Sequence, residues 1–193
     1  MTVSQQRHIV SVIGNARLPK GDRRLALAHE TGRLLVDHGY AVMTGGMGGV
    51  MNAALEGARM SSAWSTGSCI ALLPGSDPGH PLVSKAADLV IPTGLDHARN
   101  QIVAQSHAVI VIGGGAGTLT EMGFAWIHKR LLIAFRCEGW SGRLADERVD
   151  TRTRYPEIAD DRVYGIDTAQ EAISLLRQLG PEYAARHRKI AAE

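Results

Sequence analysis

The sequence has few cysteines, few aromatic residues and no excess of charge of one sign. Only Cys69 and Cys137 occur among its 193 residues, without CxxC spacing, so a disulfide framework or a zinc site is unexpected, although one bond between them stays open. The formal net charge of +2 comes from 21 basic and 19 acidic residues, and predicts no nucleic-acid partner. No apolar run is long enough to cross a membrane, and no signal peptide is evident. We therefore expect a cytoplasmic protein without membrane contact.

Short runs rich in valine and isoleucine recur along the chain, at 8–14, 40–45, 68–74, 88–94, 108–114, 131–135 and 162–166. Because these runs are apolar throughout, they predict strands that are buried on both faces. Helical periodicity lies between them, at 21–38, 49–60, 96–106, 117–129 and 168–179. The alternation predicts an α/β fold: a doubly wound, Rossmann-like parallel sheet of about seven strands with helices on both faces.

The length and the 45% hydrophobic content predict one domain over residues 1–181, followed by a charged tail at 182–193. The last helix has Asp167 as its expected N-cap, with Gln170 three residues on, and ends at Gly180. The irregular, charged segment 138–161 is expected to be a solvated loop, with a lid that supplies arginines to a ligand as the alternative.

Four turns that follow predicted strands have unusual compositions, at 14–17, 44–51, 93–100 and 113–118. In a doubly wound sheet these turns share the edge at which ligands bind. Glycine lets the backbone approach a ligand, and the following helix offers unpaired N–H groups, which together favour a phosphate. The expected ligand-binding residues are Gly14, Asn15, Arg17, Gly45, Gly46, Gly49, Met51, Asn100, Gly114, Gly115, Gly117 and Thr118.

Two common nucleotide motifs are missing from these turns. A P-loop requires a lysine after its last glycine, where Val50 and Leu119 stand. The dinucleotide fingerprint requires a third glycine where Thr118 stands, so NAD is a weak expectation and we predict no cofactor.

Two charged residues near the glycines could contact the same ligand. Glu121 lies three residues after Thr118, on the same helix face, where it could accept hydrogen bonds from sugar hydroxyls or simply interact with the helix dipole. Arg99 could clamp a phosphate or a base, or form a surface ion pair with Asp96. Asn15 and Arg17 could face the base or a pyrophosphate, or serve only as turn residues.

The stretch from Gly114 to Glu121 resembles the GGxGTxxE hallmark of the Lonely Guy (LOG) family, often labelled "lysine decarboxylase-like". An earlier family loop, GGxxGxM, is matched by Gly45, Gly46, Gly49 and Met51. Ile112 and Gly113 stand where the family has Pro and its neighbour, and Asn100 replaces a lysine after Arg99. These departures resemble the sibling branch that includes molybdenum cofactor carrier proteins.

The resemblance implies a phosphoribohydrolase that releases the base from a nucleoside 5′-monophosphate, with Glu121 and Arg99 as catalytic residues. Glu121 would stabilise positive charge on the ribose and orient water. The alternative is a nucleotide or molybdopterin carrier that does not catalyse. A lysine decarboxylase would need a Schiff-base lysine, and Lys20, Lys85, Lys129 and Lys189 all lack a convincing site.

Other features predict an oligomer and no metal site. His29 and His38 do not form an HExxH motif, so metal ligation is not expected. The helix at 117–129 is apolar on nearly every side after Glu121, which predicts a homodimer or higher homo-oligomer. The alternative is that segment 138–161 covers this helix. Homodimers are also typical of the resembled family.

Overall fold

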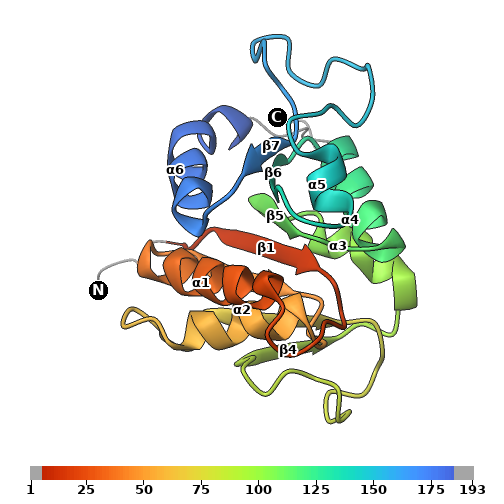
Figure 1. Ribbon diagram of the computed structural model, residues 1–193. Helices are drawn as coiled ribbons and strands as arrows, with labels where there is room; N and C mark the ends of the chain where they lie inside the picture. Colours follow the sequence, from red (N-terminus) through yellow and green to blue (C-terminus); the bar gives the residue numbers. More distant parts are fainter. Residues whose placement is uncertain (1–5, 185–193) are drawn as a thin grey trace, which may run out of the picture.

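The computed structural model describes residues 6–184, which form a single seven-stranded parallel sheet between two layers of helices (Figure 1). The strands are β1 (Ile9–Gly14), β2 (Ala41–Thr44), β3 (Cys69–Leu73), β4 (Leu89–Pro92), β5 (Ala108–Ile112), β6 (Leu131–Phe135) and β7 (Tyr164–Ile166). Their order is β4-β3-β2-β1-β5-β6-β7, and every neighbouring pair is parallel. The predicted Rossmann-like fold is confirmed, and each of the seven apolar runs contains one strand.

The helices are α1 (Arg23–Asp37), α2 (Val50–Arg59), α3 (Asn100–Val103), α4 (Ala116–Ile127), α5 (Trp140–Leu144) and α6 (Ala169–Leu179), with 3-10 turns η1 (Asp96–Arg99) and η2 (Glu182–Ala184). Apolar side chains of α1, α2 and α6 share one core on one face of the sheet. Those of α3, α4 and α5 share the second core on the other face. The helix predicted at 96–106 is instead the turn η1 followed by the single-turn α3.

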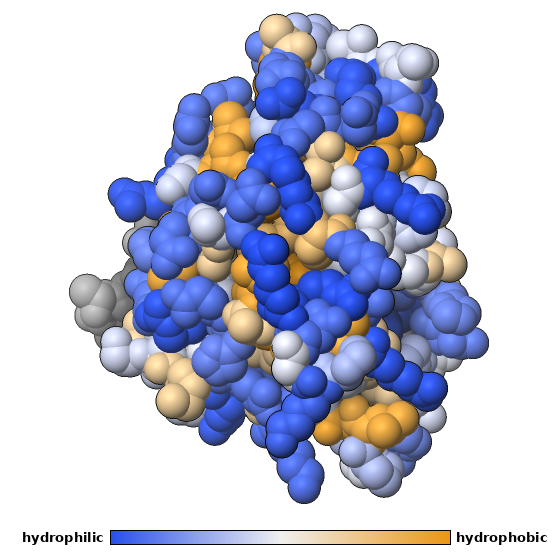
Figure 2. Space-filling model, in the orientation of Figure 1, coloured by the Kyte–Doolittle hydropathy of each residue, from blue (hydrophilic) through white to orange (hydrophobic). Residues whose placement is uncertain are grey.

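The strands β2, β5 and β6 are buried along their whole length, and β1 is buried except at its two end residues, as their composition predicted. Val10, Val12, Ile110 and Ile112 contribute to the core beneath α1 and α2, and Ile13, Val109 and Val111 to the core beneath α4. Figure 2 shows that the outer surface of the α1 and α2 layer carries mostly hydrophilic side chains with scattered apolar ones.

The predicted N-cap of the last helix is wrong by one residue. Thr168 caps α6: its hydroxyl accepts a hydrogen bond from the backbone N–H of Glu171, whose carboxylate accepts the N–H of Thr168 in return. The carboxylate of Asp167 instead accepts a hydrogen bond from Arg136 at 2.8 Å. Both residue types cap helices well, and the reciprocal bond to Glu171 selects Thr168.

The segment 138–161 is not a wholly solvated loop, because it contains α5 and covers part of α4. Asp150 accepts a hydrogen bond from the indole N–H of Trp126 at 3.0 Å, and the guanidinium of Arg154 lies 3.5 Å from the centre of the Trp126 ring. Arg154 also donates to the carbonyl of Arg130 and forms a buried ion pair with Asp161. This segment therefore covers one apolar side of α4, and its buried arginine contacts its own chain.

The predicted tail begins at η2, where Tyr183 is buried and its hydroxyl donates to Asp161 at 2.6 Å. The remainder of the predicted tail, 185–193, lies outside the described residues. Within residues 6–184 no helix is both long and apolar enough to cross a membrane. A cytoplasmic location stays a prediction.

Candidate nucleotide site

A crevice is expected where the direction of winding reverses, between β1 and β5. The chain leaves β1 toward α1 on one face and leaves β5 toward α4 on the other, while Gly14 pairs with Ile112 at the ends of the two strands. Open α/β sheets bind ligands at this position because the two following loops separate there.

Asn15 joins three of the turns at this edge. Its backbone carbonyl accepts the N–H of Val50, at the start of α2, at 2.9 Å. Its side-chain oxygen accepts the N–H of Gly114 at 2.7 Å. The carboxamide of Asn15 therefore holds two glycine-containing loops together, and only its amino group remains for a ligand.

Residues at the start of α5 hold the same glycine loop from the other side. The hydroxyl of Ser141 accepts the N–H of Gly113 at 2.8 Å, and the N–H of Ser141 donates to the carbonyl of Gly113 at 3.0 Å. The N–H of Trp140 donates to the carbonyl of Gly114 at 3.1 Å. Ser141 was missed by the sequence analysis because it lies in an irregular segment with no motif around it.

The N–H groups of Gly113 and Gly114 thus already donate hydrogen bonds within the chain. The expected contact with an anion therefore lies further along the loop, at the start of α4. Gly115 is the N-cap of α4 and makes no side-chain cap, while Ala116 and Gly117 are exposed in the first turn. The first N–H groups of a helix have no partner within it. This turn therefore offers free donors and a partial positive charge to a phosphate.

Gly114 also has a steric reason to be glycine. Its φ is +99°, and a Cβ there would lie 2.4 Å from the Cβ of Thr118. The side chain of Thr118 is consequently buried directly beneath the loop.

Arg99 and Glu121 form a buried ion pair beside these loops. Nη1 of Arg99 lies 3.3 Å from Oε1 of Glu121, and the two residues are only 8% and 7% exposed. Arg99 is therefore not paired on the surface with Asp96, which was the alternative considered from the sequence. Gly45 makes room for the guanidinium, because a Cβ there would lie 2.6 Å from Nη1 of Arg99.

Burial dominates the electrostatics of this pair. It raises the pKa of Glu121 to about 7, although the nearby Arg99 acts in the opposite direction. Burial also lowers the pKa of Arg99, opposed by Glu121 and Asp96. Nε of Arg99 is buried and has no hydrogen-bond partner among the described residues. A buried guanidinium with one long hydrogen bond and an unused donor is suited to a further anionic or polar partner.

Over residues 7–173 the sequence matches the SLOG cluster4 family. The chain belongs to this family. The expected LOG-type relationship is therefore confirmed, since SLOG proteins share the LOG-like Rossmann fold.

The proteins that are similar to this SLOG cluster4 protein include a phosphoribohydrolase and molybdenum cofactor binding and carrier proteins. It is 34% identical over 113 residues to a cytokinin riboside 5′-monophosphate phosphoribohydrolase of Mycobacterium tuberculosis, a match that covers 58% of each chain. The solved structure of a molybdenum cofactor binding protein from Rippkaea orientalis is similar with a TM-score of 0.73 and 27% identity, over 91% of this chain and 99% of that one. The Moco carrier protein of Chlamydomonas reinhardtii is similar with a TM-score of 0.70 and 26% identity, over 92% and 99%.

The other predicted site residues of the SLOG cluster4 protein have different surroundings. Met51 is buried with its sulfur near Gly45, and the N–H of Gly46 donates to the Thr44 hydroxyl at 3.0 Å. The amide of Asn100 donates to Thr120 at 3.0 Å. Arg17 is exposed and makes no hydrogen bond or ion pair with the residues that the structure describes.

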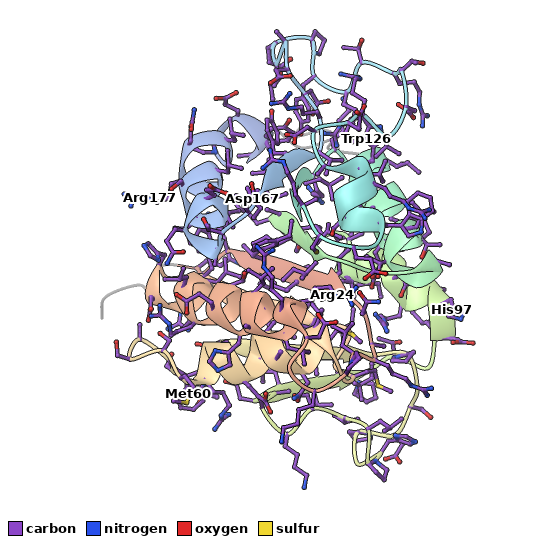
Figure 3. All side chains as sticks on the ribbon, viewed as in Figure 1. Arg24, Met60, His97, Trp126, Asp167 and Arg177 are labelled. Carbon is purple, nitrogen blue, oxygen red and sulfur yellow. The ribbon has the colours of Figure 1, made fainter. Side chains whose placement is uncertain are left out.

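Arg24 is a second residue that the sequence analysis missed. It lies at the start of α1, close to the carboxyl end of β1 (Figure 3). Its guanidinium pairs with Asp22 at 2.6 Å and donates to the carbonyl of Glu138 at 3.2 Å. It thereby ties α1 to the segment that supports Gly113.

No group of three metal-ligating side chains occurs in the described part of the chain, and both cysteines are free thiols.

Proposed function

We propose that this protein binds a phosphorylated, nucleotide-like molecule in the crevice between β1 and β5, and that it hydrolyses the N-glycosidic bond of a nucleoside 5′-monophosphate. The proposal is supported by the free N–H groups at the start of α4, by the buried pair of Arg99 and Glu121, and by the similarity to a phosphoribohydrolase.

Each group has a role that follows from its chemistry. The first turn of α4 and the Thr118 hydroxyl hold the 5′-phosphate. Arg99 contacts the phosphate or the base through its unused donors. Glu121 faces the ribose, where a carboxylate stabilises the oxocarbenium-like transition state.

The reaction consumes one water molecule. The bond between C1′ and the base nitrogen breaks with its electron pair on the base, and the water oxygen bonds to C1′. Glu121 orients this water and accepts its proton, which then passes to the base, so the products are ribose 5-phosphate and the free base.

The observation that carries the proposal is the buried pair of Arg99 and Glu121 beside the glycine loops, in which burial raises the pKa of Glu121 to about 7. A carboxyl group that titrates near neutral pH can both accept and return a proton under ordinary conditions. Burial next to an arginine with an unused donor is difficult to account for by stability alone, because buried ion pairs contribute little to it.

A second candidate function is that of a carrier for a nucleotide or for the molybdenum cofactor. It is favoured by the similarity to molybdenum cofactor binding proteins, which covers more than nine tenths of this chain. The match to the phosphoribohydrolase covers only 58% of it. A carrier needs the loops and the phosphate contact, and it needs no carboxyl group that exchanges protons.

The two functions are separated by incubating the purified protein with a panel of nucleoside monophosphates and measuring free base by chromatography. We expect base release that falls at least tenfold in Glu121→Gln and Arg99→Ala, but not in Glu147→Gln, a matched change at an exposed glutamate. Base release that is equal in all variants overturns the hydrolase. A copurified ligand that survives native mass spectrometry without turnover favours the carrier.

We also propose that the protein forms a homodimer through the face of the sheet that α3 and α4 cover. Leu89 and Ile91 pair with Ile70 and Leu72, whose side chains belong to the core of this face, yet both are exposed on the edge strand β4. Ile102 of α3 and Ile127 of α4 are also exposed. Segment 138–161 covers the Trp126 side of α4 but leaves Ile127 exposed, so apolar surface remains among the described residues.

The oligomer is tested by light scattering after size-exclusion chromatography. Ile102→Glu is expected to yield monomers, whereas Met60→Glu, at the end of α2 on the opposite layer (Figure 3), is expected to leave the dimer intact. A parent protein that elutes as a monomer contradicts the proposal.

A further inference from the structure

Two consecutive residues at the junction of η1 and α3 are hydrogen-bonded to two consecutive residues of α4. Arg99, the last residue of η1, donates to the carboxyl group of Glu121. Asn100, the first residue of α3, donates from its side-chain amide to the hydroxyl of Thr120 at 3.0 Å. The second of these bonds leads to the turn at which the phosphate is expected.

The hydroxyl of Thr120 continues this connection into the first turn of α4. It accepts the amide of Asn100 and donates to the backbone carbonyl of Gly117 at 2.7 Å. We refer to this chain of hydrogen bonds, from Asn100 through Thr120 to Gly117, as the relay. The carbonyl of Gly117 and the N–H of Thr118 belong to one planar peptide unit. Thr118 lies in the first turn of α4, where N–H groups have no partner within the helix, so the relay fixes the direction of a donor that a ligand can use.

The relay also strengthens the donor at its end. In a chain of hydrogen bonds each bond polarises the next, so a hydroxyl that accepts a hydrogen bond is itself a better donor. A carbonyl that accepts such a bond in turn makes the N–H of its own peptide unit more positive. The N–H of Thr118 is therefore held in place and polarised before a ligand arrives.

The members of the relay differ in their access to a ligand. Asn100 is only 5% exposed, so its side chain is largely hidden from solvent. Gly117 is exposed, and a Cβ added to it would meet no other part of the described chain within 4 Å. A ligand can therefore approach the turn at Gly117 much more closely than it can approach Asn100.

We infer that Asn100 and Thr120 are positioning residues, which set the first turn of α4 for a phosphate group and make the site prefer phosphorylated ligands over unphosphorylated ones. This inference rests on the proposed function, which assigns the 5′-phosphate to that turn. Asn100 acts through Thr120, and Thr120 acts through the peptide unit that joins Gly117 to Thr118. The relay ends at this peptide unit, so it affects binding of the phosphate and not of the sugar or the base.

The inference is tested by comparing the affinities for a panel of ribonucleoside 5′-monophosphates and for the matching nucleosides, measured by ligand-detected nuclear magnetic resonance. Chromatography of each sample verifies that the base is still attached. Thr120→Val keeps the shape of the side chain and removes the hydroxyl. It is expected to weaken binding of the monophosphates about three- to tenfold and to leave binding of the nucleosides unchanged. Thr120→Ser keeps the hydroxyl and should bind both as the parent does.

A double variant tests whether the two residues act in series. Asn100→Ala alone should reduce the preference for monophosphates. Because Asn100 acts through Thr120, adding Asn100→Ala to Thr120→Val should cause no further loss of that preference. Thr120 is exposed, so its variants keep the test valid even if Asn100→Ala fails to fold.

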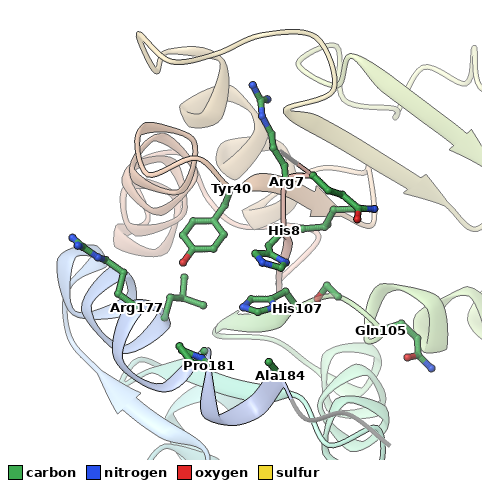
Figure 4. A pocket seen from close by; sticks show the side chains of 13 residues that line it. Arg7, His8, Tyr40, Gln105, His107, Arg177, Pro181 and Ala184 are labelled. Atoms are coloured by element: carbon green, nitrogen blue, oxygen red, sulfur yellow. The ribbon is translucent and has the colours of Figure 1, made fainter. Parts of the chain in front are cut away.

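Two control variants lie away from the crevice. Ser174→Ala removes a hydroxyl that donates to the carbonyl of Gln170 at 3.0 Å, a bond of the same kind in α6, on the other face of the sheet from α4. Arg177→Gln alters a cavity of about 680 Å³ at the opposite edge of the sheet, which Tyr40 and His107 also line (Figure 4). Both variants are expected to bind the monophosphates as the parent does.

The possible failures of the inference and of the proposed function are distinguishable. The inference alone is overturned if the parent prefers monophosphates and Thr120→Val keeps this preference, or if Thr120→Val weakens binding of monophosphates and nucleosides equally. A loss in Thr120→Ser as large as that in Thr120→Val overturns it as well. The proposed function fails, and the inference with it, if the parent binds monophosphates no more tightly than nucleosides or if only Arg177→Gln loses them.

Discussion

The side-chain oxygen of Asn15 accepts the backbone N–H of Gly114 at 2.7 Å, across 99 positions of sequence. This one bond connects the loop after β1 with the loop after β5, and the carbonyl of Asn15 extends the connection to α2. The loops that follow β1 and β5 are thus hydrogen-bonded to each other at the point where a ligand is expected.

Replacing Asn15 should show whether this hydrogen bond supports ligand binding as well as folding. Asn15→Ala leaves the buried N–H of Gly114 without a partner, which should lower the free energy of unfolding by about 1–3 kcal/mol. Asn15→Asp keeps the acceptor and should lose less stability, but its negative charge should weaken binding of nucleoside monophosphates. Urea unfolding and ligand titration measure the two effects, and equal stability of Asn15→Ala and the parent contradicts the role assigned to this bond.

The buried carboxyl group of Glu121 predicts that stability depends on pH. Its pKa is raised from 4.5 to about 7 in the folded protein, so the folded state binds the proton more tightly than the unfolded state. Its contribution is fully present below pH 4.5 and is lost as the pH rises through 7. We expect a loss of up to about 3 kcal/mol from this group. Unfolding curves from pH 5 to 8 should show this slope in the parent and a smaller slope in Glu121→Gln.

Gly45→Ala should disturb the site by displacing Arg99. The new Cβ would lie 2.6 Å from Nη1 of Arg99 and 2.8 Å from the sulfur of Met51. Such overpacking costs about 1–3 kcal/mol of stability, and it should also weaken ligand binding. Gly75→Ala is the control, since nothing lies within 4 Å of the added Cβ. If both variants bind nucleotide as the parent does, the position of Arg99 is unimportant for binding.

Two arginine–aspartate pairs in segment 138–161 should differ sharply in their effect on stability. Arg154 is buried with Asp161 and stacks on Trp126, so Arg154→Ala should lower the free energy of unfolding by about 3–5 kcal/mol. Arg152 pairs with Asp150 on the surface, with 74% of its side chain exposed. Arg152→Ala should therefore cost less than about 1 kcal/mol. Thermal and urea unfolding of both variants measure the two losses of stability. Equally small losses in Arg154→Ala and Arg152→Ala would show that the buried arginine of segment 138–161 does not stabilise α4.

The strands could be predicted because a parallel sheet covered on both faces imposes uninterrupted apolar runs. The N-cap of α6 could not be fixed to one residue, since Asp167 and Thr168 are both good caps and the deciding bond comes from Glu171. The helix α5 was missed because its five residues are too few to show periodicity.

Which residues contribute to the candidate site could largely be predicted from the sequence, but the hydrogen bonds between them could not. The glycine motifs and the i, i+3 spacing of Thr118 and Glu121 indicated a phosphate site with a carboxyl group nearby. That Arg99 bonds Glu121 instead of Asp96 depends on how η1 packs against α4, which no local pattern encodes. The hydroxyl of Ser141 lies on a separate element, and its bond to Gly113 follows only from the tertiary fold.

The bonds from Asn15, Trp140 and Ser141 to the loop at Gly113 and Gly114 also bear on the thermodynamics of recognition. A loop whose shape is already set loses little conformational entropy when a ligand arrives, so most of the interaction energy remains available as affinity. The loop is in this sense preorganised: its ordering occurs during folding, and the free and ligand-bound forms should share one loop conformation.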